Sequence, residues 1–205
     1  NFEKTPASYH IRSPMEEVDS PVFIIGFPRS GTTLLDTILR SHPNIEVIEE
    51  EPLIDRVVSA LKKPVSPTTL CQLSSKQIIG LRSLYEEELK RSVGTVRNGQ
   101  IIIDKFPLNI IHVPLIKTLF PKSKYILVLR HPCDCVLSCF MQNFELNEAM
   151  INFLNIKDTV SLYSNVMRLW SVYSERLDLN VEIVKYENLI SDFESTSKKI
   201  LGFLN

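Results

Sequence analysis

Short apolar runs alternate along this chain with longer segments in which apolar residues recur at helical spacing. The runs predict strands over 22–26, 45–48, 101–103, 125–129 and 181–184. Helical spacing predicts helices over about 31–41, 52–61, 74–92, 107–119 and 158–177, one from 132, and a last one ending near 204. In the segment 74–92 the apolar stripe consists of Ile78, Leu81, Leu84, Tyr85 and Leu89. Prolines predict a loop over 63–69, and residues 145–156 show no regular period.

This order of elements predicts an α/β fold. Strands that are apolar throughout are typical of a parallel sheet covered by helices on both faces, so we expect three layers around a central, mainly parallel sheet. The 205 residues suffice for one domain, over 21–205. Residues 1–20 have no clear period, and we interpret them as a linker or N-terminal arm.

The first predicted strand leads into a loop suited to phosphate. Gly26 and Gly31 have the glycine spacing of a P-loop, but Thr32 and Thr33 replace its final Lys-Ser/Thr pair. Arg29 supplies the positive charge from inside the loop, and the start of the next helix offers free backbone N–H groups. We predict a site for an anionic nucleotide. The alternative is an ordinary strand-to-helix turn.

Polar residues also follow the other predicted strands. They are Glu49 and Glu50, Asp104 and Lys105, Arg130, and the segment 185–187. Because ligands of parallel sheets bind beyond the carboxyl ends of the strands, we expect these residues to gather with Arg29.

Composition narrows the class of partner. The net charge of −1 gives no basic excess, so we do not expect nucleic acid, and no apolar run has the length of a membrane helix. Cys133, Cys135 and Cys139 with His131 lack the spacing of a zinc module, and free thiols on a helix are the alternative that we favour. Free thiols favour a reducing compartment, and we expect a cytoplasmic protein.

Two separated signatures resemble those of sulfotransferases that use 3′-phosphoadenosine 5′-phosphosulfate (PAPS). The segment 27–33 is similar to that family's loop for the 5′-phosphosulfate, and 129–138 to its signature for the 3′-phosphate. The segments 104–109, 139–143 and 185–189 resemble most closely bacterial sulfotransferases that follow tetratricopeptide repeats, and next tyrosylprotein sulfotransferases. The likeness covers roughly residues 20–205.

The resemblance implies a role for each candidate residue. It implies that the donor is bound by Arg29, Ser30, Gly31, Thr32, Thr33, Arg130, Ser138 and Tyr186. Arg130 and Ser138 would hold the 3′-phosphate, whereas Arg29 and Lys105 would stabilise charge during transfer. Glu50, seven residues after His42-Pro43, would be the catalytic base, and no metal is required.

Each assignment has an alternative from the residues alone. Arg130 could pair with Asp134, Lys105 could be a solvated lysine, and the run 49–51 could be a solvated face. Within that run we favour Glu50 over Glu49 as the base.

The implied reaction is in-line transfer of a sulfuryl group from PAPS to a hydroxyl or amine. The acceptor, whether protein tyrosine, carbohydrate or small molecule, stays open. A P-loop kinase or NTPase, with Asp104 holding magnesium, and a non-catalytic nucleotide-binding module are the competing hypotheses.

The chain departs from the family pattern in two ways. The small-molecule branch has Lys at the position of Arg29, and the family continues past Asn205 with a segment over the adenosine. We therefore expect a domain truncated at its C-terminus, attached in the full-length protein to N-terminal helical repeats.

Overall fold

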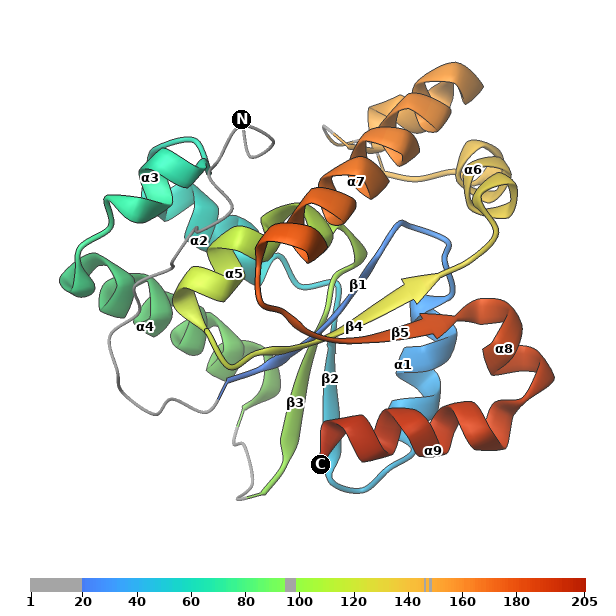
Figure 1. The fold of residues 1–205 in the computed structure, drawn as a ribbon, viewed down its shortest axis with the longest axis horizontal. Helices are drawn as coiled ribbons and strands as arrows, with labels where there is room; N and C mark the ends of the chain where they lie inside the picture. The colour runs from blue at the N-terminus through green and yellow to red at the C-terminus, as the bar shows by residue number, and fades with distance from the viewer. Residues whose placement is uncertain (1–19, 95–98, 146, 148) are drawn as a thin grey trace.

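The computed structural model describes residues 20–94, 99–145, 147 and 149–205. Figure 1 shows a central sheet with helices on both faces, which confirms the predicted α/β fold with three layers. Of the predicted arm over 1–20, residues 1–19 lie outside the described residues.

The sheet of the described residues has five strands in the order β2-β3-β1-β4-β5, and every neighbouring pair is parallel. The strands are β1 (Val22–Gly26), β2 (Ile45–Glu49), β3 (Ile101–Lys105), β4 (Lys124–Leu129) and β5 (Asn180–Lys185). All residues of β1 are buried, because it lies at the centre of the sheet with β3 and β4 on its two sides. The chain reverses its direction of travel across the sheet here, and parallel sheets bind ligands at such a point.

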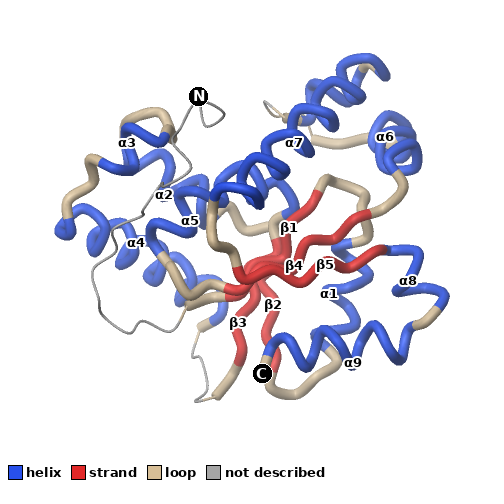
Figure 2. The backbone as a smooth tube through the Cα atoms, in the orientation of Figure 1, coloured by secondary structure: helices blue, strands red, loops and turns tan. Residues whose placement is uncertain are grey.

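One face of the sheet packs against the first and the last helices of the described chain. Leu35 and Leu39 of α1 (Thr32–Arg40) share a core cluster with Ile24 and Val128 of the central strands. Helices α8 (Tyr186–Ser191) and α9 (Phe193–Leu204) cover the same face beside β5, as Figure 2 shows.

The other face carries the larger core cluster. It packs against α2 (Leu53–Leu61), α3 (Pro67–Cys71), α4 (Ser75–Val93), the 3-10 helix η2 (Pro107–His112), α5 (Val113–Leu119) and α7 (Ile156–Arg176). The predicted stripe of α4 is confirmed, since Ile78, Leu81 and Tyr85 are buried there and Leu84 and Leu89 pack against them. Helix α6 (Pro132–Met141) and the 3-10 helix η3 (Met150–Leu154) pack against α7.

Four element predictions need correction. The loop predicted over 63–69 contains the start of α3, where Ser66 caps the helix and Pro67 takes its first position. The irregular segment 145–156 includes η3, and the helix predicted over 107–119 begins as η2. The last helix is two helices, because Asp192 takes a non-helical conformation and caps α9.

None of the helices among the described residues combines the length and the apolar character that crossing a bilayer requires.

Candidate active site

The loop between β1 and α1 depends on two glycines. A Cβ on Gly26 would lie 2.7 Å from the Val128 carbonyl oxygen of β4. Gly31 has a φ of 103°, and a Cβ there would lie 2.4 Å from the ring of Tyr186. The loop therefore passes too close to β4 and α8 for any larger residue.

The start of α1 is free to receive an anion. Gly31 offers no side-chain cap, and the first turn contains no acidic residue. The helix dipole and the unpaired N–H groups therefore lack a negative partner from the helix itself. The hydroxyl of Ser30 is buried without a hydrogen-bond partner in the structure, as is Nε of Arg130. Buried polar atoms of this kind are normally satisfied, and both are donors that an anionic ligand would satisfy.

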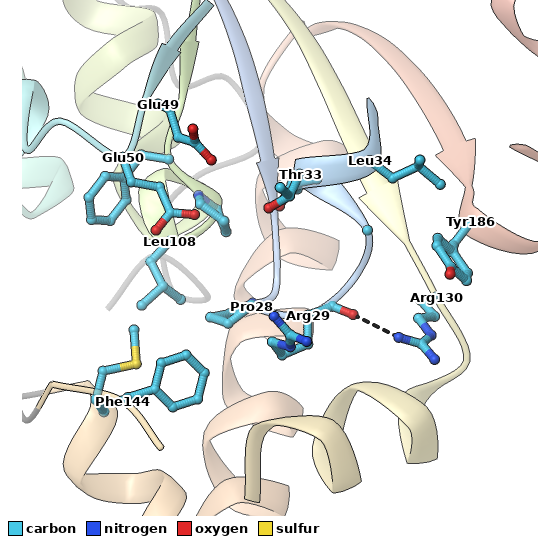
Figure 3. A pocket seen from close by; sticks show the side chains of 15 residues that line it. Pro28, Arg29, Thr33, Leu34, Glu49, Glu50, Leu108, Arg130, Phe144 and Tyr186 are labelled. Atoms are coloured by element: carbon cyan, nitrogen blue, oxygen red, sulfur yellow. Dashed lines mark hydrogen bonds between the residues drawn. The ribbon is translucent and has the colours of Figure 1, made fainter. Parts of the chain in front are cut away.

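A pocket of about 480 Å³ opens at the carboxyl ends of the strands. Figure 3 shows that its two sides differ. Arg130 and Tyr186 lie on one side of Arg29, whereas Glu50, Leu108 and Phe144 lie on the other. The gathering predicted from the strand ends is thus confirmed for residues that follow β1, β2, β4 and β5.

The cationic side is organised by the segment after β5. The guanidinium of Arg130 lies over the ring of Tyr186, 4.7 Å from its centroid, and Glu187 accepts a 2.8 Å hydrogen bond from the backbone N–H of His131. That hydrogen bond lowers the pKa of Glu187. The alternative partner of Arg130 is present but loose, since its Nε lies 3.7 Å from the Asp134 carboxylate. The ring of Tyr186, at the start of α8, therefore orients the Arg130 guanidinium, whose remaining N–H groups can donate to a ligand.

Ser138 is hydrogen-bonded to the donor loop. Its hydroxyl accepts a 3.0 Å hydrogen bond from Nε of Arg29, and Arg130 donates to the backbone oxygen of Arg29 at 3.3 Å (Figure 3). Arg29 itself has a φ of 68°. Arg29, Arg130 and Ser138 thus form one hydrogen-bonded group.

The acidic side is built from the ends of β2 and β3. Nζ of Lys105 donates to Glu49 at 3.0 Å and to Glu50 at 2.9 Å. The lysine side chain is completely buried, whereas those of Glu49 and Glu50 are 49% and 55% exposed. The hydrogen bond from Lys105 lowers the pKa of Glu49. Lys105 therefore lies behind the two carboxylates, and the alternative of a solvated lysine is wrong.

Glu50 also has an unusual backbone. Its φ is 53°, and the other non-glycine residues with a positive φ in the described chain are Arg29 and Lys62. Such conformations cost of order 1–3 kcal/mol and gather at functional sites. Two of the three belong to charged residues that line this pocket.

Asp104 points away from the pocket. It is 1% exposed and accepts hydrogen bonds from the Tyr85 hydroxyl at 3.1 Å and from the Asn109 side chain at 3.3 Å. Burial raises the pKa of its carboxyl to about 7. A carboxylate held in this way faces the core, so its geometry does not favour the magnesium-holding role of the kinase hypothesis.

The two inner cysteines of α6 lie beneath the loop. Cys135 and Cys139 are buried, and Sγ of Cys139 lies 3.4 Å from the Pro28 carbonyl oxygen. Burial raises the pKa of the Cys135 thiol to about 11 and that of Cys139 to about 12. Both therefore stay protonated at neutral pH, and they are the buried free thiols on one helix face that the spacing predicted.

The sequence did not predict the apolar side chains that line the pocket, nor the two charged residues of α1 that contact Lys105 and Glu49. The apolar lining on the side of Glu50 includes Phe106, Pro107, Leu108, Phe144 and Met150. Asp36 and Arg40 of α1 contact Lys105 and Glu49 from behind. Their i,i+4 spacing was the available signal, but exposed helices commonly show such pairs.

Comparison with known proteins agrees with this geometry. A sequence model of the sulfotransferase family matches residues 21–205. A protein-tyrosine sulfotransferase A of Caenorhabditis elegans is 26% identical over 191 residues, which cover 90% of this chain and 49% of that protein. The human protein-tyrosine sulfotransferase 1 is 31% identical over 134 residues, which cover 60% of this chain and 33% of that protein. The chain thus spans about half the length of such relatives, or less.

Solved structures show the same fold. A sulfotransferase domain from the curacin biosynthetic pathway superposes with a TM-score of 0.62 at 17% identity, covering 93% of this chain and 75% of that one. Mouse sulfotransferase SULT7A1, solved in complex with PAP, superposes with a TM-score of 0.52 at 22% identity, covering 92% and 59% of the two chains.

Proposed function

This chain belongs to the sulfotransferase family, and we propose that it transfers a sulfuryl group from PAPS to a hydroxyl or amine. One observation carries the proposal. A single pocket brings together the loop between β1 and α1, two arginines, Arg29 and Arg130, and a carboxylate, Glu50. Transfer requires both the cations and the carboxylate, because the donor is anionic and the acceptor must lose a proton.

The residues present fit the donor. The Ser30 hydroxyl and Nε of Arg130 are buried without a hydrogen bond, Arg130 lines the pocket, and Gly31 gives the start of α1 no side-chain cap. Arg130 and Ser138 are proposed to hold the 3′-phosphate, with Tyr186 supporting Arg130. The mouse relative solved with PAP, which is adenosine 3′,5′-bisphosphate, supports this choice of donor.

The chain's own residues account for the remaining steps. When bound, PAPS supplies the sulfuryl group and leaves as PAP. Glu50 accepts the acceptor's proton at its carboxylate, which is half exposed to the pocket. Arg29 and Thr33 donate to charge that develops at the start of α1. Lys105 is proposed to act on charge from behind Glu50, since its ammonium is buried there.

We propose that the acceptor carries its reactive group on an apolar or aromatic body. The side of the pocket next to Glu50 is lined by Phe106, Leu108, Phe144 and Met150, all partly exposed. Such a surface gains free energy by covering apolar groups, but it offers no hydrogen bonds to the several hydroxyls of a sugar. The likeness to protein-tyrosine sulfotransferases supports the same choice.

The donor assignment predicts a preference that calorimetry can measure. PAP should bind more tightly than ATP, without a need for Mg²⁺. Arg130→Ala should weaken PAP at least about tenfold, because charged hydrogen bonds contribute roughly 1.5–3 kcal/mol each, and AMP should change little. Lys198→Ala, which removes an exposed cation of α9, is the matched control. Tighter, magnesium-dependent binding of ATP would favour the kinase hypothesis, and equal losses for PAP and AMP would refute the 3′-phosphate role.

The acceptor assignment predicts the outcome of a screen with labelled PAPS. Phenols and alkyl alcohols should accept the label in preference to monosaccharides. Leu108→Asn should raise KM for the best acceptor by roughly tenfold, because burying a leucine side chain contributes about 1.5–3 kcal/mol, and PAP affinity should not change. Preferential labelling of sugars would contradict the assignment.

A further inference from the structure

Five charged side chains from three elements meet behind the acceptor side of the pocket. They are Asp36 and Arg40 of α1, Glu49 and Glu50 at the end of β2, and Lys105 of β3. Glu49 and Glu50 line the pocket, whereas Asp36, Arg40 and Lys105 are absent from its lining. The cluster therefore joins the helix that begins at the donor loop to the proposed base.

Lys105 is the centre of this cluster. Its Nζ lies 2.9 Å from Glu50, 3.0 Å from Glu49 and 4.0 Å from Asp36. The lysine side chain is completely buried, and that of Asp36 is 3% exposed. A buried ammonium costs several kcal/mol unless its charge and its three donors are satisfied. Glu49 and Glu50 accept two of its donors, and Asp36 at 4.0 Å contributes charge without a hydrogen bond, so the positions of these carboxylates depend on one another.

Arg40 closes the cluster into a ring. Its Nη2 donates to Asp36 at 3.2 Å and lies 3.6 Å from the second oxygen of Glu49. The ring therefore runs Asp36–Arg40–Glu49–Lys105 with alternating sign, and Glu50 is attached to it through Lys105 alone. Three carboxylates against two cations leave one net negative charge. Glu50 lies outside the ring and is the most exposed of the three carboxylates, so the excess negative charge lies on the pocket side of the ring.

We propose that Asp36 is a positioning residue for Glu50. The negative charge of Asp36 offsets part of the positive charge of Lys105. The ammonium therefore orients the Glu50 carboxylate through its hydrogen bond without cancelling the charge of that carboxylate. Asp36 also anchors this arrangement to α1, three residues after Thr33 of the donor loop. The inference rests on the proposed function for its catalytic consequence, but the charge coupling within the ring can be measured separately.

The test is Asp36→Asn, which keeps the shape and an acceptor for Arg40 but removes the charge. The carboxyl titration of Glu50 is followed by NMR on protein labelled at the glutamate carboxyl carbons, with Glu50→Gln to assign the signal. We expect the Glu50 titration midpoint to move to lower pH in Asp36→Asn, because Lys105 then attracts Glu50 with one competitor fewer. Arg40→Gln, on a side chain that is 40% exposed, should move it to higher pH.

Turnover gives the second readout. Asp36→Asn should lower kcat by roughly tenfold, a fraction of the 10²- to 10⁴-fold that a general base contributes, and should leave the Kd for PAP within about twofold. Glu194→Gln, which breaks an exposed i,i+4 pair with Lys198 on α9, is the matched control and should change neither readout.

Two results would overturn the proposal. One is a Glu50 titration that neither Asp36→Asn nor Arg40→Gln moves. The other is a loss of PAP affinity in Asp36→Asn equal to its loss of kcat, because Asp36 would then act only on the donor loop. If the wild-type protein sulfated no acceptor, the proposed function would fail, but the titration would still decide whether the ring exists.

Discussion

Replacing Glu50 by glutamine is expected to lower turnover by about 10²- to 10⁴-fold while PAP binds as tightly as before. Glutamine keeps the size of the side chain and can still accept the hydrogen bond from Lys105, which spans 2.9 Å in the wild type. It cannot accept the acceptor's proton. Single-turnover kinetics with labelled PAPS measure the chemical step directly, and calorimetry with PAP measures donor binding.

The neighbouring carboxylate is the matched control. Glu49 binds the same ammonium, but it faces α1 and also lies 3.6 Å from Arg40. Glu49→Gln should therefore have a much smaller effect on turnover. The opposite order of effects would exchange the roles of the two residues. If both variants kept full turnover, the base would have to be another residue.

The strand ends were predictable because one physical rule governs them. Parallel strands that start together also end together, so polar residues directly after apolar runs must meet at one edge. Arg29, Glu50 and Arg130 meet there for this reason, and the two glycines of the first loop let it lie close to β4 and to Tyr186. The alternation of strands and helices likewise predicted all five strands of the described sheet.

Side-chain direction was not predictable in the same way. Consecutive residues of a strand point to opposite faces, so Asp104 and Lys105 cannot both face the same layer. The structure turns Asp104 toward Tyr85 on α4 and Lys105 toward Asp36 on α1. Sequence alone does not say which face each helix covers, so it could not separate a buried lysine from one that lines the pocket.

The buried carboxyl of Asp104 has a consequence for stability that can be measured. Burial raises its pKa from 3.8 to about 7, although the hydrogen bond from Tyr85 opposes the shift. The folded protein therefore binds more protons than the unfolded chain between about pH 4 and pH 7. The contribution of Asp104 to the free energy of unfolding is fully present below about pH 4 and is lost as the pH rises toward 7.

Asp104→Asn should remove that loss. An asparagine can accept from Asn109 and donate to the Tyr85 oxygen, so it keeps the hydrogen bonds that span 3.3 Å and 3.1 Å in the wild type without carrying a charge. One pKa unit corresponds to about 1.4 kcal/mol, so the variant's free energy of unfolding relative to wild type should rise by about 2–3 kcal/mol between pH 5 and pH 8. Urea denaturation at the two pH values measures the change.

The control separates burial from net charge. Asp178→Asn removes an exposed carboxylate and should show no comparable rise. A similar rise in both variants would mean that the overall charge of the chain, and not the buried site, controls the pH dependence. A fall in the relative stability of Asp104→Asn at pH 8 would mean that the Asp104 carboxylate is stabilised in its ionised form. A cation bound at Asp104 would produce that sign, so this measurement also bears on the magnesium-holding role that the kinase hypothesis requires.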